Sequence, residues 1–116
     1  MTAVFSPCRR YRYRLERDVA TLESTRGAVA FIGLNPSIAD ETLDDPTIRR
    51  CKGFALGWGF RRLIVANAYA WRSTDPRGLW TADDPVGAEN DAHIEAIASD
   101  VELVVCAWGA HAKPDR

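Results

Sequence analysis

The chain has 116 residues, of which 47% are apolar and 27% charged, and its net charge at pH 7 is −1. This composition is ordinary for a globular protein, and the length predicts one domain that spans residues 1–116. A nearly neutral chain has no overall field that attracts polyanions, so binding to nucleic acid would depend on a local basic patch. One such patch lies within nine residues near the start: Arg9, Arg10, Arg12, Arg14 and Arg17.

The three cysteines, Cys8, Cys51 and Cys106, are far apart and include no Cys-x-x-Cys pair. This spacing argues against a disulfide framework and against a zinc site, so we expect no metal and no other cofactor. Cys106 falls inside an apolar run and is predicted to be a core residue. The sequence shows no leader-like segment and no apolar run of membrane-spanning length, which predicts a cytoplasmic location and no membrane partner.

Residues 10–15 alternate between arginine and a tyrosine or leucine, which predicts a half-exposed strand. Tyr11, Tyr13 and Leu15 would form its inner face. The arginines of the outer face suit a strand at the edge of a sheet, where charge discourages pairing with other chains. A strip that contacts phosphate groups is the alternative interpretation.

A continuous apolar run at residues 28–34 predicts a strand that is covered on both faces, and residues 63–66 and 101–107 predict two more. A helix is expected to begin at Pro46, with Asp44 or Asp45 as its cap. Its apolar spacing predicts one buried stripe, made of Ile48, Cys51, Ala55 and Trp58. A second helix is predicted over residues 88–98, with three side chains facing inward: Ile94, Ile97 and Ala98.

Strands that alternate with helices predict a three-layer α/β/α domain with a mainly parallel central sheet. The last predicted strand comes a few residues before Arg116, where another helix would be expected to begin. One face of this strand is therefore expected to lack its cover. Such a domain would be completed by a second copy or would be truncated at its C-terminus.

Polar residues follow each predicted central strand, and in open α/β sheets the carboxyl ends of the strands form the crevice that binds ligands. The first strand leads into Gly33, Asn35, Pro36 and Ser37. The glycine allows close approach of a backbone or a flat ligand, and Pro36 stiffens the loop. Asn35 could hold a water molecule or the edge of a base. Alternatively, Asn35 and Pro36 form a turn in which the amide bonds to nearby backbone.

The second strand ends at Asn67, an amide that is costly to bury unless its hydrogen bonds are satisfied. Either backbone groups satisfy it or it faces a ligand, and its donor and acceptor match the edge of a pyrimidine. Tyr69 and Trp71 follow, and they suit base stacking and ordinary core packing equally well. Arg72 could neutralise a phosphate or pair with a nearby acid.

The third strand leads into Trp108, Gly109 and His111. The histidine could donate a proton, bind phosphate or simply lie at the start of a helix. The sequence contains no Ser/His/Asp set, no phosphate-binding loop of the Gly-Lys-Ser type and no zinc spacing. Hydrolases and nucleotide-triphosphate enzymes of those kinds are therefore disfavoured.

Many short motifs occur in an order that resembles one bacterial family, which is catalogued as domain of unknown function 1643. They are the Tyr/Arg strand, Asn67 and residues 33–37, 44–51, 58–60, 73–76, 84–87, 90–91 and 107–111. The resemblance spans nearly the whole chain. Because that family has no settled activity, it implies a fold more than a function.

A more distant resemblance is to the uracil-DNA glycosylase superfamily, and it implies a glycosylase-like fold. The mismatch-specific branch carries a Gly-x-Asn-Pro-Gly motif whose asparagine positions the attacking water; Asn35 matches it, and Ser37 replaces the last glycine. The pyrimidine-reading asparagine of the superfamily ends a central strand, as Asn67 does. A later strand ends in Trp-Gly, like Trp108 and Gly109.

This resemblance implies hydrolysis of an N-glycosidic bond, in which the sugar becomes cationic while the base leaves as an anion. Asn35 would orient the water and Asn67 would bind the edge of a base taken out of its stack. The superfamily stabilises the leaving base with a histidine in a His-Pro segment, for which His111 is the stand-in here. Loss of a donor of this type costs on the order of a hundred- to a thousandfold in rate.

We therefore predict a nucleobase or nucleic-acid binding domain with a glycosylase-like fold, whose reaction, if it is an enzyme, is N-glycosidic hydrolysis. The expected partner is nucleic acid or a nucleotide. The alternative is a non-catalytic structural or interaction protein that self-associates. The net charge and the missing His-Pro segment favour binding without chemistry, and the polar strand ends favour a ligand site.

Overall fold

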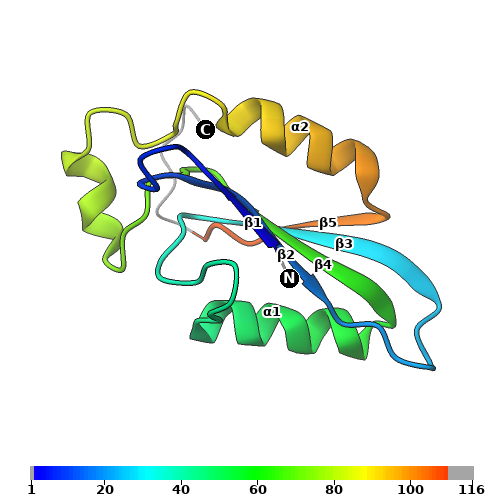
Figure 1. Cartoon of the computed structure of the whole chain (residues 1–116). Helices are drawn as coiled ribbons and strands as arrows, with labels where there is room; N and C mark the ends of the chain where they lie inside the picture. Colours follow the sequence, from blue (N-terminus) through cyan, green and yellow to red (C-terminus); the bar gives the residue numbers. More distant parts are fainter. Residues whose placement is uncertain (1, 110–116) are drawn as a thin grey trace.

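The computed structural model describes residues 2–109. Five strands form one sheet in the order β1-β2-β4-β3-β5, with a long helix against each face (Figure 1). The strands are β1 (Thr2–Phe5), β2 (Arg12–Asp18), β3 (Arg26–Gly33), β4 (Phe60–Asn67) and β5 (Leu103–Cys106). The helices are α1 (Pro46–Gly57), α2 (Asn90–Asp100) and the short 3₁₀ helix η1 (Pro76–Thr81). The predicted α/β class is confirmed.

The sheet is mixed, which corrects the prediction of a mainly parallel sheet. β3 pairs in parallel with β4 and with β5. β2 pairs antiparallel with both β1 and β4. A parallel pair needs a crossover of about a dozen residues or more, and only residues 6–11 join β1 to β2. The two N-terminal strands therefore form a hairpin-like pair at one side of the parallel strands.

Apolar side chains pack on both faces of the sheet. The cluster on the α1 face includes Leu15, Val29, Phe31, Leu63 and Val65. The cluster on the α2 face includes Ala28, Ala30, Ile32, Ile64, Ala66 and Ile97. Neighbouring residues of β3 and β4 thus alternate between two cores, which explains why both strands have uninterrupted apolar sequences.

Helix α1 begins where the sequence predicts. Asp45 is its N-cap, and the Asp45 carboxylate accepts a hydrogen bond of 2.9 Å from the Ile48 N–H. Pro46 occupies the first turn, where its missing N–H is not needed. The helix packs on the sheet through Ile48, Cys51 and Ala55. The N-terminus of α1 therefore has a fixed position next to the carboxyl end of β3.

Strand β5 is less buried than the sequence predicts. Cys106 is exposed, which corrects its assignment to the core, and Leu103 and Val104 are 37% and 39% exposed. β5 lies at one edge of the sheet, with β3 as its neighbour. Trp58 and Ala98, two other predicted core residues, are exposed as well. Three of the four side chains of this edge strand are exposed.

Strand β2 is not at the edge of the sheet, which corrects the prediction for the basic strand. It lies between β1 and β4, and its register with β1 shifts between Val4 and Phe5. An irregularity of this kind breaks the alternation of side chains between the two faces. As a result Arg12 is 2% exposed, although the sequence placed it on a solvent-exposed face. Arg17 is 1% exposed because it follows the regular alternation from the buried Leu15.

Arg17 holds the loop that precedes α1. Its Nε donates to the Asp44 carboxylate at 2.8 Å, and its Nη2 donates to the carbonyl oxygens of Asp40 and Leu43. Lys52 contacts the other carboxylate oxygen of Asp44 at 2.8 Å. A buried guanidinium with these partners fixes the path of the chain from residue 40 to the start of the helix.

We predict that Arg17→Met lowers the free energy of unfolding by about 2–3 kcal/mol. The loss lies below the range for a fully buried pair, because Asp44 keeps Lys52 as a partner. The control is Arg62→Met, which removes a half-exposed ion pair with Glu16 and is expected to cost less than about 1 kcal/mol. Urea denaturation at pH 7 measures both, and equal losses in the two variants would contradict the prediction.

Candidate functional site

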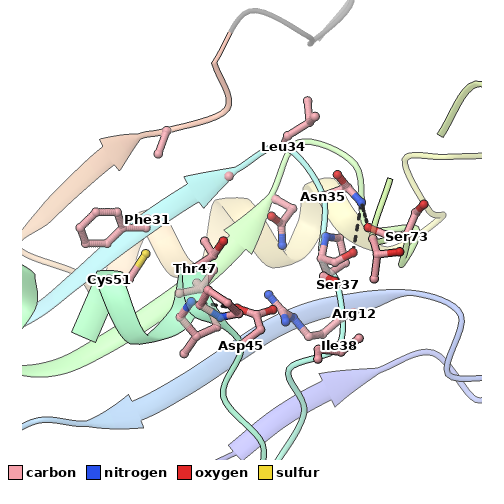
Figure 2. A pocket seen from close by; sticks show the side chains of 18 residues that line it. Arg12, Phe31, Leu34, Asn35, Ser37, Ile38, Asp45, Thr47, Cys51 and Ser73 are labelled. Carbon is pink, nitrogen blue, oxygen red and sulfur yellow. Dashed lines mark hydrogen bonds between the residues drawn. The ribbon is translucent and has the colours of Figure 1, made fainter. Parts of the chain in front are cut away.

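A cavity of about 420 Å³ opens at the carboxyl ends of β3 and β4, on the face of the sheet that carries α1 (Figure 2). Its walls are residues 33–38 after β3, the first turn of α1, and Ser73 and Thr74 after β4. This is the crevice in which open α/β sheets bind ligands. The two amides singled out in the sequence, Asn35 and Asn67, both line it.

The register of β3 and β4 sets Gly33 against Asn67. A Cβ atom at Gly33 would lie 2.9 Å from the Oδ1 of Asn67, which is closer than such atoms approach in proteins. The glycine therefore makes room for the Asn67 amide, where the sequence suggested room for a backbone or a flat ligand. Asn67 is 3% exposed, so its amide is held in the cavity wall.

Two buried donors in the cavity wall have no hydrogen-bond partner among residues 2–109: Asn67 Nδ2 and Arg12 Nε. An unsatisfied buried donor costs about 1–3 kcal/mol, and native proteins contain few of them. A third unpartnered atom, Asn90 Oδ1, belongs to α2 and does not line this cavity. The unsatisfied buried polar atoms in the cavity wall are thus both hydrogen-bond donors, which suits a ligand that presents acceptors.

Arg12 gives the cavity a positive charge. Its Nη1 donates to the Ala39 carbonyl at 3.2 Å, and it forms no ion pair with a carboxylate of the described residues. Burial lowers the pKa of Arg12 to about 10, while the charge of Asp45 opposes this change. The side chain is still protonated at pH 7. Figure 2 shows Arg12 and Asp45 together near the start of α1.

The Asn35 amide is anchored by main-chain groups. Its Nδ2 donates to the carbonyl oxygens of Pro36 at 3.1 Å and Ser73 at 2.7 Å (Figure 2). The Asn35 nitrogen thus bonds to main-chain groups, as expected if Asn35 and Pro36 form a turn. The two bonds fix the amide plane, and among residues 2–109 no donor is bonded to the Asn35 Oδ1. That oxygen is the part of Asn35 with capacity for a water molecule.

Sequence reasoning did not identify several other lining residues as part of the site, among them Arg12, Phe31 and Cys51. Arg12 belongs to the alternating basic segment and was assigned to its outer face. The register shift between β1 and β2 that turns Arg12 inward cannot be recognised from the alternation of residues in the sequence. Phe31 was assigned to the core; it lines the cavity and stacks on Trp58 with ring centroids 5.9 Å apart. Cys51 also lines the cavity, but burial raises the pKa of its thiol, which disfavours the nucleophilic thiolate.

Two residues predicted near Asn67 lie elsewhere. Tyr69 is 2% exposed and packs with Leu79 in a separate apolar cluster, with its ring edge-to-face against Trp80. Its position corresponds to the core-packing interpretation. Arg72 lines a neighbouring groove rather than this cavity, and its Nε donates to the Ser37 carbonyl at 3.2 Å.

The motif after β5 contributes less than the sequence predicted. Trp108 and Gly109 are exposed and do not line the cavity, although Ala107 does. His111 lies outside the described residues. Among the described residues, the structure brings together the polar strand ends at Asn35 and Asn67.

Within residues 2–109, no group of three or more His, Cys, Asp or Glu side chains is arranged to hold a metal ion. None of the helices in this part of the chain has the length and apolar character needed to cross a membrane. The cavity is lined by two amides, one arginine, the Asp45 carboxylate that caps α1, four hydroxyl side chains and apolar groups.

A family model described as a protein of unknown function (DUF1643) matches residues 12–116. The chain belongs to this family. The match begins at the first residue of β2 and includes Arg12, Asn35 and Asn67. Comparison with curated proteins and with solved structures finds no match. The resemblance to DUF1643 is confirmed, and the resemblance to uracil-DNA glycosylases stays a prediction.

We predict that Gly33→Ala destabilises the protein by about 1–3 kcal/mol, because the added methyl group collides with the Asn67 amide. Gly27→Ala is the matched control on the same strand, since a Cβ there meets nothing within 4 Å. In the double variant Gly33→Ala/Asn67→Ala the collision is absent, and most of the loss should be recovered. Urea denaturation measures all three; a double variant no more stable than Gly33→Ala would contradict this account.

Proposed function

We propose that this DUF1643 protein binds a nucleobase in the cavity at the ends of β3 and β4. The observation that carries the proposal is the buried Asn67 Nδ2, which lines the cavity and has no partner among the described residues. A side-chain amide presents a donor and an acceptor side by side, as the edge of a base does. Arg12 Nε adds a second donor for an acceptor of the ligand.

The shape and lining of the cavity support this proposal. About 420 Å³ lies within the usual range for small-molecule sites, which are mostly apolar with a few placed polar groups. Phe31, Ile48 and Val65 supply apolar walls, and the Phe31 ring supplies an aromatic surface. A base outside its stack is held in this way, by hydrogen bonds to its edge and by aromatic or apolar side chains.

The resemblance to uracil-DNA glycosylases assigns a role to each amide of the cavity. By this resemblance, Asn67 would bind the edge of the base and Asn35 would orient the attacking water. Both residues line one cavity, although they are 32 positions apart in the sequence. The glycosylase-like fold itself belongs to the proposal, because it depends on this resemblance.

Hydrolysis of an N-glycosidic bond is the second candidate, and the anchored Asn35 favours it. With Nδ2 bonded to Pro36 and Ser73, Oδ1 is available to accept a hydrogen bond from water and orient it. The water oxygen would bond to the anomeric carbon as the bond to the base nitrogen breaks. The base would leave with that electron pair and take up the proton released by the water.

We predict that Asn67→Ala weakens nucleoside binding by about tenfold, the loss expected for one or two hydrogen bonds. Uridine, thymidine, cytidine, adenosine and guanosine are titrated in turn, and the side-chain amide signals of a ¹⁵N-labelled sample are followed by NMR. The bound nucleoside should shift the Asn67 signals first. If no nucleoside binds to the folded wild-type protein, the proposal is wrong.

Asn90→Ala is the matched control, because the Asn90 amide has a structural role. Its Nδ2 donates to the Asn67 carbonyl at 2.8 Å and the Ala68 carbonyl at 3.3 Å. Removal of these bonds should lower the free energy of unfolding by about 1–3 kcal/mol. Asn67→Ala removes a side-chain nitrogen that has no hydrogen bond to residues 2–109 in the absence of ligand, so this variant should lose less stability than Asn90→Ala. The reverse order would show that Asn67 is a structural residue.

Incubation with uracil- or mismatch-containing DNA, followed by alkaline strand scission, separates binding from hydrolysis. Strand breaks that disappear with Asn35→Ala would support the hydrolase. A folded sample that binds a base and produces no abasic sites would be a binding module without chemistry.

A further inference from the structure

A second, shallower hollow of about 310 Å³ adjoins the cavity at the ends of β3 and β4. The two share four lining residues: Ser37, Ile38, Ser73 and Thr74. The remaining walls are Arg9, Arg10, Trp71 and Arg72, and we call this hollow the arginine groove. No acidic side chain of residues 2–109 lines it, although the net charge of the chain is −1.

The groove is a built feature, because main-chain pairing holds its two sides together. Tyr11 forms an antiparallel bridge with Trp71. The Arg72 N–H donates to the Arg10 carbonyl at 2.9 Å. The loop between β1 and β2 and the segment after β4 are therefore fixed side by side, although they are about sixty residues apart in the sequence.

The charges of two arginines in the groove are not neutralised. Arg9 forms a two-bond ion pair with Glu41, at 2.8 and 2.9 Å. Arg72 donates to the main-chain carbonyls of Ser37 and Arg9, and Arg10 lies over the Trp71 ring at 5.3 Å. Among residues 2–109 neither Arg10 nor Arg72 forms an ion pair. Both guanidinium groups thus remain cations beside the mouth of the cavity.

We propose that the arginine groove binds the sugar–phosphate backbone of a single-stranded nucleic acid, whose base enters the adjoining cavity. The proposal rests on the base binding proposed above and names the class of ligand. Unpaired arginines bind phosphate by charge-assisted hydrogen bonds. Trp71 and the guanidinium plane of Arg10 also provide the stacking surface used by proteins that bind single strands. A free base has no phosphate and would leave the groove unused.

The single strand is favoured over a duplex because a base can enter the cavity only when it is unstacked and unpaired. A single strand meets this condition without the cost of opening a duplex, which is a few kcal/mol for each flipped base. The cavity and the groove share a rim, so one nucleotide can occupy both.

The test uses a fluorescein-labelled DNA of eight nucleotides that contains uracil and all four common bases. Its affinity is measured by fluorescence polarisation between 50 and 300 mM salt, as a single strand and as a duplex. Two phosphate contacts on a single strand predict a slope of about −1.4 for log K against log salt. The single strand should bind more tightly than the duplex and more tightly than any nucleoside.

Arg10→Gln should weaken strand binding and reduce the size of the slope by about 0.7, the amount expected for one phosphate contact. Arg10 is exposed, so this variant should fold. The control is Arg61→Gln, which removes an exposed arginine near the opposite end of β4 from Asn67 and should leave both quantities unchanged. A flat salt dependence, equal effects of the two variants, or tighter duplex binding would overturn the proposal.

The failure of this proposal can be told apart from failure of base binding. If nucleosides bind through Asn67 and the strand binds no more tightly than they do, the groove proposal is wrong and base binding stands. If the strand binds through Arg10 and Asn67→Ala has no effect, the groove binds phosphate and the base-binding proposal is wrong.

Discussion

The parallel pairing of β3 with β4, in one particular register, is the constraint on which the site depends. It places Gly33 against Asn67 and continues past the strand ends, where the Ala68 and Tyr69 N–H groups donate to the Gly33 and Leu34 carbonyls. The two polar loops therefore leave the sheet at the same edge. A shift of one residue would move the Asn67 side chain to the α2 face, because side chains alternate between faces.

Buried polar groups of the same type have different partners in this protein, and the difference locates the site. Arg17 has an ionised carboxylate and main-chain carbonyls around it, whereas Arg12 Nε has no partner among residues 2–109. Asn90 Nδ2 donates to two carbonyls, whereas Asn67 Nδ2 has no partner in the described part of the chain. The side chains whose donors are satisfied stabilise the scaffold, and the two with an unsatisfied donor nitrogen, Arg12 and Asn67, both line one cavity. A ligand with acceptors would remove this cost.

The sequence predicted the α/β class, the central strands, the cap of α1 and two of the polar strand ends, because apolar runs and capping residues are local signals. It did not predict the mixed sheet or the inward turn of Arg12, since both depend on how β2 pairs with β1 and β4. It also could not choose between stacking and packing for Tyr69. That choice was decided by Leu79 and Trp80, which come later in the chain.

The bond from Asn90 to the Asn67 carbonyl joins two layers of the molecule. Helix α2 covers one face of the sheet, and the cavity opens on the other (Figure 1). Asn90, the first residue of that helix, therefore holds the main chain of Asn67 in place by a hydrogen bond. The orientation of the Asn67 side chain in the cavity therefore depends on how α2 packs against the opposite face of the sheet.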